Sequence, residues 1–318
     1  MKLRHSIMLG TLGRYADRFH CYQPARSLEE RLIDIREVIK ADGIEIVYPQ
    51  DFADERTVEL VKKSGLPVSA VNVNVKSEDK WRRGSFTAPD EKTRREAVAY
   101  LQTGMDLAAE LGTDMVTCCP LIDGHNYAFE ADYTKQWRWL EEGIYAAASH
   151  RSDIKVSLEY KLNESRNFNI LSDVGRTLYL CEKLGLPNLG ITMDVGHALI
   201  AKETPAEAFS LAAAAGRMFY LHLNDNSREW DWDMIPGSVN YWDLLEVLFY
   251  VKRLNWSGWI SYDVFARDGH PIETLQATIS IVNNTIELLD KVGQDKLEEL
   301  LAGGVAAQTF AHLVKSLL

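Results

Sequence analysis

The chain has 318 residues, of which 46% are hydrophobic and 25% charged, and it carries a formal net charge of −11 at pH 7. This composition is typical of a globular protein, and no apolar run approaches the ~20 residues that a membrane-spanning helix needs. A nucleic-acid partner is not expected, because phosphates are bound by clustered Lys and Arg, and the nearest such cluster is Lys80, Arg82 and Arg83. The charge favours a small neutral or cationic partner, or no particular partner.

The cysteines and the N-terminus predict a reduced, cytoplasmic protein. The four cysteines are scattered without a CxxC spacing, and the adjacent Cys118 and Cys119 are poorly suited to a disulfide framework. The N-terminal segment MKLRHSIMLGTLGRY has a short apolar patch but neither the apolar region nor the cleavage site of a signal peptide. We therefore expect free thiols and a cytoplasmic location.

Short apolar runs of β-forming residues alternate with helical patterns along the whole chain. The predicted strands lie at residues 5–10, 43–49, 67–75, 113–120, 154–160, 189–197, 217–225 and 258–265. The predicted helices, which show a 3.6-residue apolar period, lie at residues 27–40, 91–111, 133–150, 173–184, 205–215, 240–254 and 273–292. Ser27 followed by Glu30 predicts a capping box at the first helix. Glycines are expected to end helices at Gly43, Gly65, Gly112, Gly185 and Gly216.

This alternation predicts an α/β fold built as a single (β/α)8 TIM barrel over residues 1–293. An open doubly wound sheet is the alternative, but no GxGxxG follows the first strand. Residues 294–318 read as extra C-terminal helices, packed on the barrel or placed at a subunit interface.

Polar side chains lie at the ends of the last four predicted strands, where the active sites of such barrels lie. They are Glu159 and Lys161, Asp194 and His197, His222, and Asp263. Each alone is more often a helix cap, a surface charge or a core histidine. Carboxylates of like charge that converge in one cavity need a cation among them. Three carboxylates and a histidine suit a divalent metal, with Mn²⁺ favoured and Mg²⁺, Co²⁺ and Zn²⁺ as alternatives.

These residues resemble the xylose isomerase-like TIM-barrel superfamily, which includes sugar isomerases, ketose epimerases and relatives of endonuclease IV. The set is most similar to that of rhamnose isomerase-type enzymes. The resemblance implies a first metal site formed by Glu159, Asp194, His222 and Asp263. It also implies a second metal site formed by His197, Asp231 and Asp233, and a lysine, Lys161, that polarises the sugar carbonyl.

The chain also departs from that pattern. It is shorter than typical rhamnose isomerases, and the interval from His222 to Asp231 is longer than in that group. Many relatives have a Pro-Gly-x-Gly turn where this chain has Pro-Gly-Ser-Val at 236–239. Asp263 stands where the epimerase and endonuclease branches have Glu. The second metal site is therefore less firmly implied than the first.

Two sugar chemistries fit such a centre. In a hydride-shift isomerase, metals polarise the carbonyl and Lys161 adds positive charge where the oxyanion develops. In a proton-transfer epimerase, two carboxylates flank the reacting carbon, and Glu159 and Asp263 could fill these roles. We expect a divalent-metal-dependent sugar isomerase or epimerase.

Other activities stay open at this point. One is a 3-keto-glycoside lyase such as a C-glycoside deglycosidase α subunit, which works with a small β subunit and for which His125 could be the general base. An endonuclease IV-like phosphodiesterase would need more histidines and a basic rim. A non-catalytic sugar- or metal-binding barrel is the remaining possibility.

Several side chains near the strand ends are expected to contact the substrate. They are Trp81, Asn224, Arg228 and Trp230. Trp81, Trp230 and Trp232 could stack on a sugar ring, with core packing as the alternative for each. Asn224 and Asp225 could instead support the metal ligands. The resemblance also implies a homo-oligomer, either a dimer or a tetramer.

Overall fold

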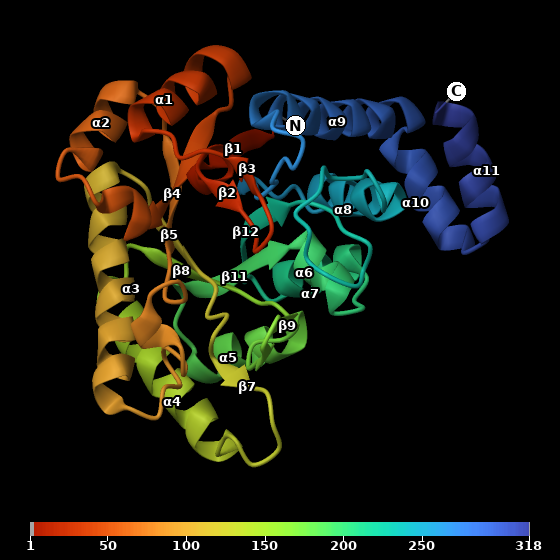
Figure 1. The fold of residues 1–318 in the computed structure, drawn as a ribbon. Coiled ribbons are helices and arrows are strands. Elements are labelled where there is room, and N and C mark those ends of the chain that lie inside the picture. Colours follow the sequence, from red (N-terminus) through yellow and green to blue (C-terminus); the bar gives the residue numbers. More distant parts are fainter. Residues whose placement is uncertain (1–2, 318) are drawn as a thin grey trace.

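A computed structural model of the chain describes residues 3–317. Its centre is a closed barrel of parallel strands in the order β1-β13-β12-β11-β8-β6-β5-β4 (Figure 1). The strands are β1 (Arg4–Met8), β4 (Gly43–Tyr48), β5 (Val68–Val73), β6 (Met115–Cys118), β8 (Lys155–Glu159), β11 (Leu189–Asp194), β12 (Met218–Leu223) and β13 (Trp259–Tyr262). Each predicted strand overlaps one of them, and β1 closes the barrel by pairing with both β13 and β4. The predicted TIM-barrel fold is confirmed.

Helices surround the barrel, in most cases where the sequence predicts them. They are α1 (Leu28–Ile33), the π-helical η2 (Asp34–Ile39), α2 (Thr57–Ser64), α3 (Glu91–Leu111), α4 (Tyr133–Ala148), α5 (Val174–Leu184), α6 (Val195–Ile200), α7 (Pro205–Ala214), α8 (Tyr241–Arg253) and α9 (Pro271–Val292), with short turns η1 (Leu9–Leu12), η3 (Gln50–Phe52) and η4 (Asp79–Trp81). The capping box is present, since Ser27 Oγ accepts from Glu30 N and Glu30 Oε2 accepts from Ser27 N. For α2 the sequence predicts only the end at Gly65, and α6 is not predicted.

One predicted helix end is wrong. Gly65, Gly112 and Gly185 take the expected left-handed conformation after their helices. Gly43 does not, because Lys40, with φ of 61°, already ends the preceding helix. Gly43 instead begins β4, where a Cβ would lie 2.8 Å from the Pro67 carbonyl oxygen. Its small size is needed for packing rather than for a turn.

The barrel interior is polar, as contacts between non-adjacent strands show. Ser69 on β5 bonds through its hydroxyl to Tyr220 on β12, at 2.6 Å. Thr117 on β6 donates to Glu45 on β4, at 2.7 Å. The apolar core lies mainly between the strands and the surrounding helices. A polar interior allows charged side chains at the carboxyl ends of the strands to be supported from below.

Small sheets lie in the loops beyond the strand ends. One is the pair β2 (Tyr15–Ala16) and β3 (Cys21–Gln23). The other has the order β7-β10-β9, built from β7 (Gly124–His125), β9 (Asn163–Glu164) and β10 (Asn167–Asn169). These sheets stiffen loops that line the cavity described below.

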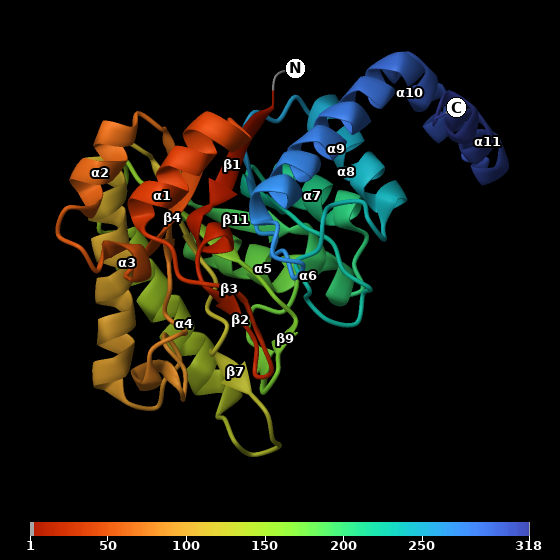
Figure 2. The ribbon, with the colours of Figure 1, turned by 45° about the horizontal axis from the view of Figure 1, so that its top comes forward.

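The C-terminal helices α10 (Gln294–Gly303) and α11 (Ala306–Leu317) extend away from the barrel and contact it through α9 (Figures 1 and 2). Phe310 also packs edge-on against Trp242, with ring centroids 5.1 Å apart. Apolar side chains stay exposed on this extension, and its predicted role at a subunit interface stays a prediction. Within residues 3–317, none of the helices combines the length and apolar character that crossing a bilayer requires.

Candidate metal centre

A cavity of about 1240 Å³ opens at the carboxyl ends of the barrel strands. Its walls bring together polar side chains that lie at the ends of β8, β11, β12 and β13 or in the segments that follow these strands. Those that line it are Glu159, Lys161, His197, Asp231, Asp233 and Asp263. His222 and Asp194 are fully buried directly beside Glu159. The barrel therefore brings these residues close together, as the sequence predicts.

The orientation of His222 is set by a buried glutamate that the sequence reasoning missed. Glu45 Oε2 lies 2.9 Å from His222 Nε2, and both side chains are fully buried. Glu45 also accepts hydrogen bonds from Asn72 Nδ2 at 3.0 Å and Thr117 Oγ1 at 2.7 Å. Because a carboxylate can only accept, His222 Nε2 carries a hydrogen. The other ring nitrogen is then free to bind a cation.

His222 Nδ1 faces two carboxylates. It lies 3.5 Å from Glu159 Oε1 and 3.7 Å from Asp194 Oδ2, and it has no hydrogen-bond partner among residues 3–317. Burial lowers the pKa of His222, but the carboxylates of Glu45 and Glu159 outweigh it and raise the pKa well above its ordinary value. In the metal-free protein, protonated His222 therefore supplies the positive charge that these carboxylates need. The donor atoms of Glu159, Asp194 and His222 all lie within 4.8 Å of one another, close enough to share one ion.

Asp194 is fixed by backbone and side-chain donors. As the N-cap of α6, its Oδ1 accepts from His197 N at 2.9 Å, while its Oδ2 accepts from Asn224 Nδ2 at 2.9 Å. Asn224 Oδ1 in turn accepts from Gly196 N at 2.8 Å. A Cβ on Gly196 would overlap that oxygen, so this position requires glycine. Asn224 thus holds the Asp194 carboxylate in place and does not line the cavity of the described chain.

Opposing charges surround Glu159. Its Oε1 also lies 3.2 Å from His197 Nδ1. Although burial raises the pKa of Glu159, the neighbouring His222 and His197 lower it to about 2. Glu159 therefore stays ionised over the ordinary pH range and is available as a ligand.

Asp263, the predicted fourth ligand, lies at the edge of this cluster. Its Oδ1 is buried and makes no hydrogen bond within the described part of the chain. Burial raises the pKa of Asp263 to about 7; His222 opposes this rise, and the carboxylates of Asp194 and Glu159 add to it. It is not in a group of donor atoms within 4.8 Å of one another in residues 3–317. Asp263 thus carries a bare carboxyl oxygen that a bound cation could engage.

A second group contains Asp194, His197 and Asp231. Asp231 Oδ2 lies 3.1 Å from His197 Nε2 and 2.9 Å from Lys161 Nζ, while its buried Oδ1 has no hydrogen-bond partner in residues 3–317. Asp194 therefore belongs to both groups and could bridge two ions. Asp233 lies beside Asp231 and Asp263, and burial together with these carboxylates raises its pKa well above its ordinary value.

The loop that carries Asp231 and Asp233 is pinned at both ends. Asp225 and Met234 exchange two backbone hydrogen bonds of 2.9 Å, which turn the loop back over the barrel. The Asp225 carboxylate accepts from the backbone of Val239 at 2.8 Å and of Asn240 at 2.9 Å. Asp225 therefore supports the loop.

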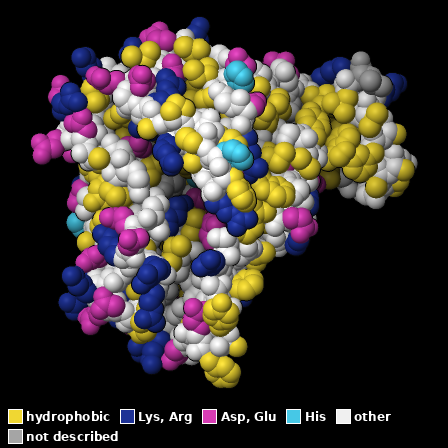
Figure 3. All heavy atoms as spheres, in the orientation of Figure 1, with side chains coloured by type: hydrophobic (Ala, Val, Ile, Leu, Met, Phe, Trp, Pro, Cys, Tyr) yellow, Lys and Arg dark blue, Asp and Glu magenta, His cyan; other side chains and the backbone are white. Residues whose placement is uncertain are grey.

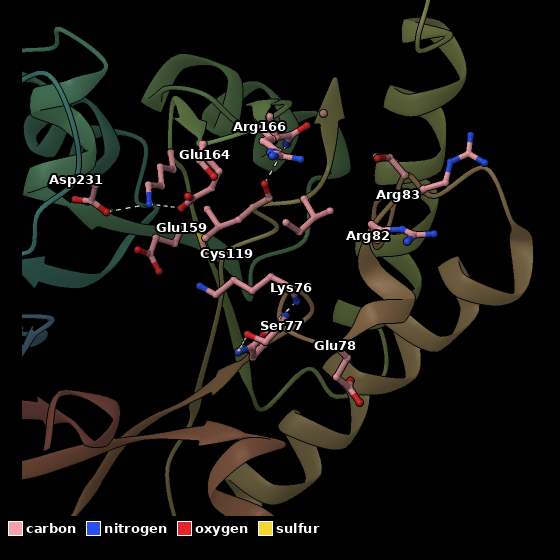
Figure 4. Close-up of a pocket in the computed structure, with 18 of the residues that line it drawn as sticks. Lys76, Ser77, Glu78, Arg82, Arg83, Cys119, Glu159, Glu164, Arg166 and Asp231 are labelled. Atoms are coloured by element: carbon pink, nitrogen blue, oxygen red, sulfur yellow. Dashed lines mark hydrogen bonds and ion pairs between the residues drawn. The ribbon is translucent and has the colours of Figure 1, made fainter. Parts of the chain in front are cut away.

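Lys161 is held between two carboxylates. It bonds to Glu164 and Asp231, whose side chains lie on the Glu159 side of the cavity in Figure 4. Burial lowers the pKa of Lys161, but Asp231 and Glu164 raise it well above its ordinary value. Lys161 therefore stays a fixed cation beside both groups.

The expected substrate contacts fit the structure poorly. Trp81 is fully buried and packs edge-on against Tyr100, with centroids 5.3 Å apart. Arg228 pairs with Asp243 at 2.7 Å, and neither Arg228 nor Trp230 lines the cavity of the described chain. Core packing thus accounts for Trp81 and ion pairing for Arg228.

His125 lies on β7 in the outer wall of the cavity. Its ring packs against Tyr133 at 4.9 Å and Phe168 at 6.2 Å between centroids. Lys76, Cys119 and Glu164 also line the cavity, and the sequence reasoning missed them. Cys119 follows β6 directly, and Lys76 follows β5 by three residues, so position after a strand could have found both.

Comparison with known proteins agrees with this architecture. Residues 35–288 match the family described as xylose isomerase-like TIM barrel. The xylose isomerase of Thermus thermophilus is 29% identical over 225 residues, which cover 69% of this chain and 57% of that protein. The xylose isomerase of Thermus caldophilus is 28% identical over 218 residues, covering 67% and 55%. The chain thus spans little more than half the length of these curated relatives.

Solved structures with the same fold include sugar epimerases. An L-ribulose 3-epimerase superposes with a TM-score of 0.72 and 18% identity, covering 94% of this chain and 98% of that one. The 3-keto-D-glucoside 4-epimerase from E. coli has a TM-score of 0.69 and 16% identity, covering 89% and 100%. At these identities the likeness establishes the fold alone.

Proposed function

The chain belongs to the xylose isomerase-like TIM barrel family, and we propose that it is a divalent-metal-dependent isomerase or epimerase of a sugar or keto-sugar. One observation carries this proposal. His222 turns toward Glu159 and Asp194 an Nδ1 that makes no hydrogen bond within residues 3–317, while Glu45 holds its other ring nitrogen. Relatives named xylose isomerase and fold neighbours named sugar epimerases support the substrate class.

The donor set fits a hard or borderline divalent ion. Glu159, Asp194 and His222 would hold it, and the bare Oδ1 of Asp263 would complete the site. Mixed carboxylate and imidazole ligands suit Mn²⁺ first, with Mg²⁺, Co²⁺ and Zn²⁺ as alternatives. A bound divalent ion would polarise a substrate carbonyl and orient neighbouring hydroxyls.

A second ion is part of the proposal for the isomerase route. Asp194, His197 and Asp231 would hold it, with Asp233 beside them. Asp231 now bonds to both Lys161 and His197 through Oδ2, so its free Oδ1 is the oxygen that would reach an ion. Two bound ions would favour the hydride-shift isomerase route, and a single ion would favour the proton-transfer epimerase route.

The protein's own residues support two routes of hydrogen transfer. In the hydride shift, the Lys161 ammonium, oriented by Asp231 and Glu164, would stabilise negative charge on the substrate oxygen. In the proton transfer, Glu159 and Asp263 would act from two sides of the reacting carbon. In the metal-free protein, burial and neighbouring carboxylates raise the pKa of Asp263 to about 7, and a divalent ion bound beside it would lower that pKa.

Elimination from a 3-keto-glycoside is not part of the proposal: its base would be His125, which lines the cavity with its ring packed against Tyr133 and Phe168. An endonuclease-like site would need more histidine ligands than His197 and His222 supply, and no contact within residues 3–317 favours a non-catalytic barrel.

Metal removal followed by a labelled-substrate assay tests the proposal. A panel of aldoses and ketoses is incubated with protein stripped by a chelator, and with the same protein after Mn²⁺ is restored. Interconversion should occur only in the restored sample, and full activity after chelation would refute the metal requirement. Retention of deuterium from the migrating carbon supports hydride shift, whereas its loss to water supports proton transfer.

A further inference from the structure

Lys76 is directed into the cavity by a rigid turn after β5. Asn74 Oδ1 accepts from the backbone N of both Lys76 and Ser77, at 3.0 Å each, and Asn74 Nδ2 donates to Ser77 Oγ at 2.8 Å. The Lys76 side chain extends from this turn across the cavity toward the Glu159 side (Figure 4). The turn therefore places a primary ammonium group inside the proposed active site.

This ammonium is free of the partners that occupy the other lysine of the site. Lys161 bonds to Asp231 and Glu164, whereas Lys76 Nζ makes neither a hydrogen bond nor an ion pair with residues 3–317. Burial lowers the pKa of Lys76, but Cys119 and Glu159 outweigh it and raise the pKa above its ordinary value. Lys76 is thus a partly buried cation with unused N–H donors.

Unpaired arginines gather at the same cavity. Arg14, Arg82, Arg83 and Arg166 line it, and their guanidinium groups form no hydrogen bond or ion pair within residues 3–317. The other arginines bond to a carboxylate, hydroxyl or backbone oxygen, except Arg18, which lies over the Phe19 ring. Figure 3 shows Lys and Arg side chains around the hollow on this face.

The arginines and Lys76 occupy different depths. In Figure 4, Arg82 and Arg83 lie on the far side of the cavity from Glu159, with their guanidinium groups turned outward. Lys76 points inward. Outer cations of this kind raise the local concentration of anions and speed their arrival, whereas an inner donor fixes the bound group. Acidic side chains, among them Asp79, Glu130 and Asp132, line the same cavity, so these arginines are distinguished by their lack of partners within residues 3–317 and not by an excess of positive charge.

Lys76 is only partly buried and lines the open cavity, and in the metal-free protein the Glu159 carboxylate helps to hold it protonated. A metal bound to Glu159 would reduce that compensation and leave the ammonium available to an anionic group. A sugar offers only neutral hydroxyl groups to Lys76 unless it carries an acid group. The cavity of about 1240 Å³ leaves room for such a substituent.

We propose that the substrate is an anionic sugar derivative, with a carboxylate or phosphate that binds Lys76 after attraction by the arginines around the cavity. This inference rests on the proposed function, since it names the substrate class of the same site. It also replaces the expectation, drawn from net charge, that the partner is neutral or cationic. Lys76 would determine specificity, and Lys161 would remain the group beside the carbonyl.

Binding of unreactive open-chain polyols tests this inference. Sorbitol, gluconate and sorbitol 6-phosphate are titrated calorimetrically into Mn²⁺-loaded protein, into Lys76→Met, and into the control Lys63→Met. Lys63 is an exposed lysine on α2 that does not line the cavity of the described chain. At least one anionic polyol should bind the unmodified protein and Lys63→Met about ten- to a hundredfold more tightly than sorbitol does. In Lys76→Met this preference should largely disappear. Comparison of gluconate with sorbitol 6-phosphate shows whether a carboxylate or a phosphate is preferred.

Equal binding of the three polyols, or no binding of any, overturns the inference. A preference for gluconate that survives in Lys76→Met reports a carboxylate on the metal and also overturns it. Metal-dependent interconversion of neutral sugars without any charge preference would refute the inference and leave the proposed function standing. A charge preference that depends on Lys76, in a protein that interconverts no neutral or anionic sugar, would refute the function and leave the binding role of Lys76 intact.

Discussion

Glu45→Gln is expected to weaken metal binding without removing any proposed ligand. Glu45 Oε1 accepts from Asn72 and Thr117, and a glutamine oxygen can keep both bonds. The new amide nitrogen would then face His222 Nε2 at the present carboxylate position, 2.9 Å away. Because an amide N–H donates, it would make Nε2 the acceptor and place the ring hydrogen on Nδ1. That is the nitrogen required by the metal.

The magnitude follows from the role of Glu45 behind the ligand. Loss of such supporting partners typically weakens metal affinity by about 10- to 100-fold, or roughly 1.4 to 2.8 kcal/mol. The assay is competition for Mn²⁺ against a chelating dye, with the exposed Glu59→Gln as the matched control. Thermal unfolding of the metal-free variants shows whether the barrel is intact. Unchanged Mn²⁺ affinity in a folded Glu45→Gln protein would refute the assignment of Nδ1 as the ligand atom.

Three further predictions concern the same centre. In metal-free protein, Asp194 and Asp231 overcome burial and raise the pKa of His197 from 6.5 to about 9, so protonated His197 stabilises the fold below pH 6.5 and this stabilisation is lost as pH rises through 9. Chemical denaturation should show that the free energy of unfolding falls by up to about 3 kcal/mol over this range relative to His197→Asn. Parallel pH profiles of the two proteins would contradict the prediction. Gly196→Ala should lower the free energy of unfolding by about 1–3 kcal/mol and weaken Mn²⁺ binding, because the new methyl group overlaps Asn224. The control Gly303→Ala, which has open space around it, should have little effect in thermal unfolding. Equal stability of the two variants would count against the packing argument. Lys161→Met should reduce kcat about a hundredfold or more if the ammonium stabilises the oxyanion, with little change in KM, and near-normal kcat would exclude that role.

The barrel and much of its site could be predicted because both follow from local sequence. Strand runs and helix periods are short-range patterns, and parallel strands in a barrel all end at the same face. Glu159, Asp194 and His222 could therefore be placed together without knowing their distances. Glu45 could not, because its partner lies 177 residues further along the chain and a lone glutamate in an apolar strand does not reveal it.

Other errors came from properties that appear only on folding. Trp81 has the side chain of a sugar-stacking residue, and only the packing against Tyr100 shows that it is buried. The net charge of −11 predicts an acidic surface, but ion pairing elsewhere leaves Lys76 and four arginines unpaired at one cavity. A total charge is an average over the surface and does not describe the field inside a cleft.

The acidic segment at 222–234 shows why residue type alone does not identify a ligand. Asp225 and Asp231 are both aspartates on the same loop. Both oxygens of Asp225 accept hydrogen bonds, from Asn226, Val239 and Asn240, so no lone-pair direction is left facing the cavity. Asp231 keeps a buried Oδ1 with no partner in residues 3–317, and its Oδ2 is shared by Lys161 and His197. Saturation by backbone donors makes Asp225 the anchor of the loop, and the unsatisfied oxygen makes Asp231 the position where a second ion would have to bind.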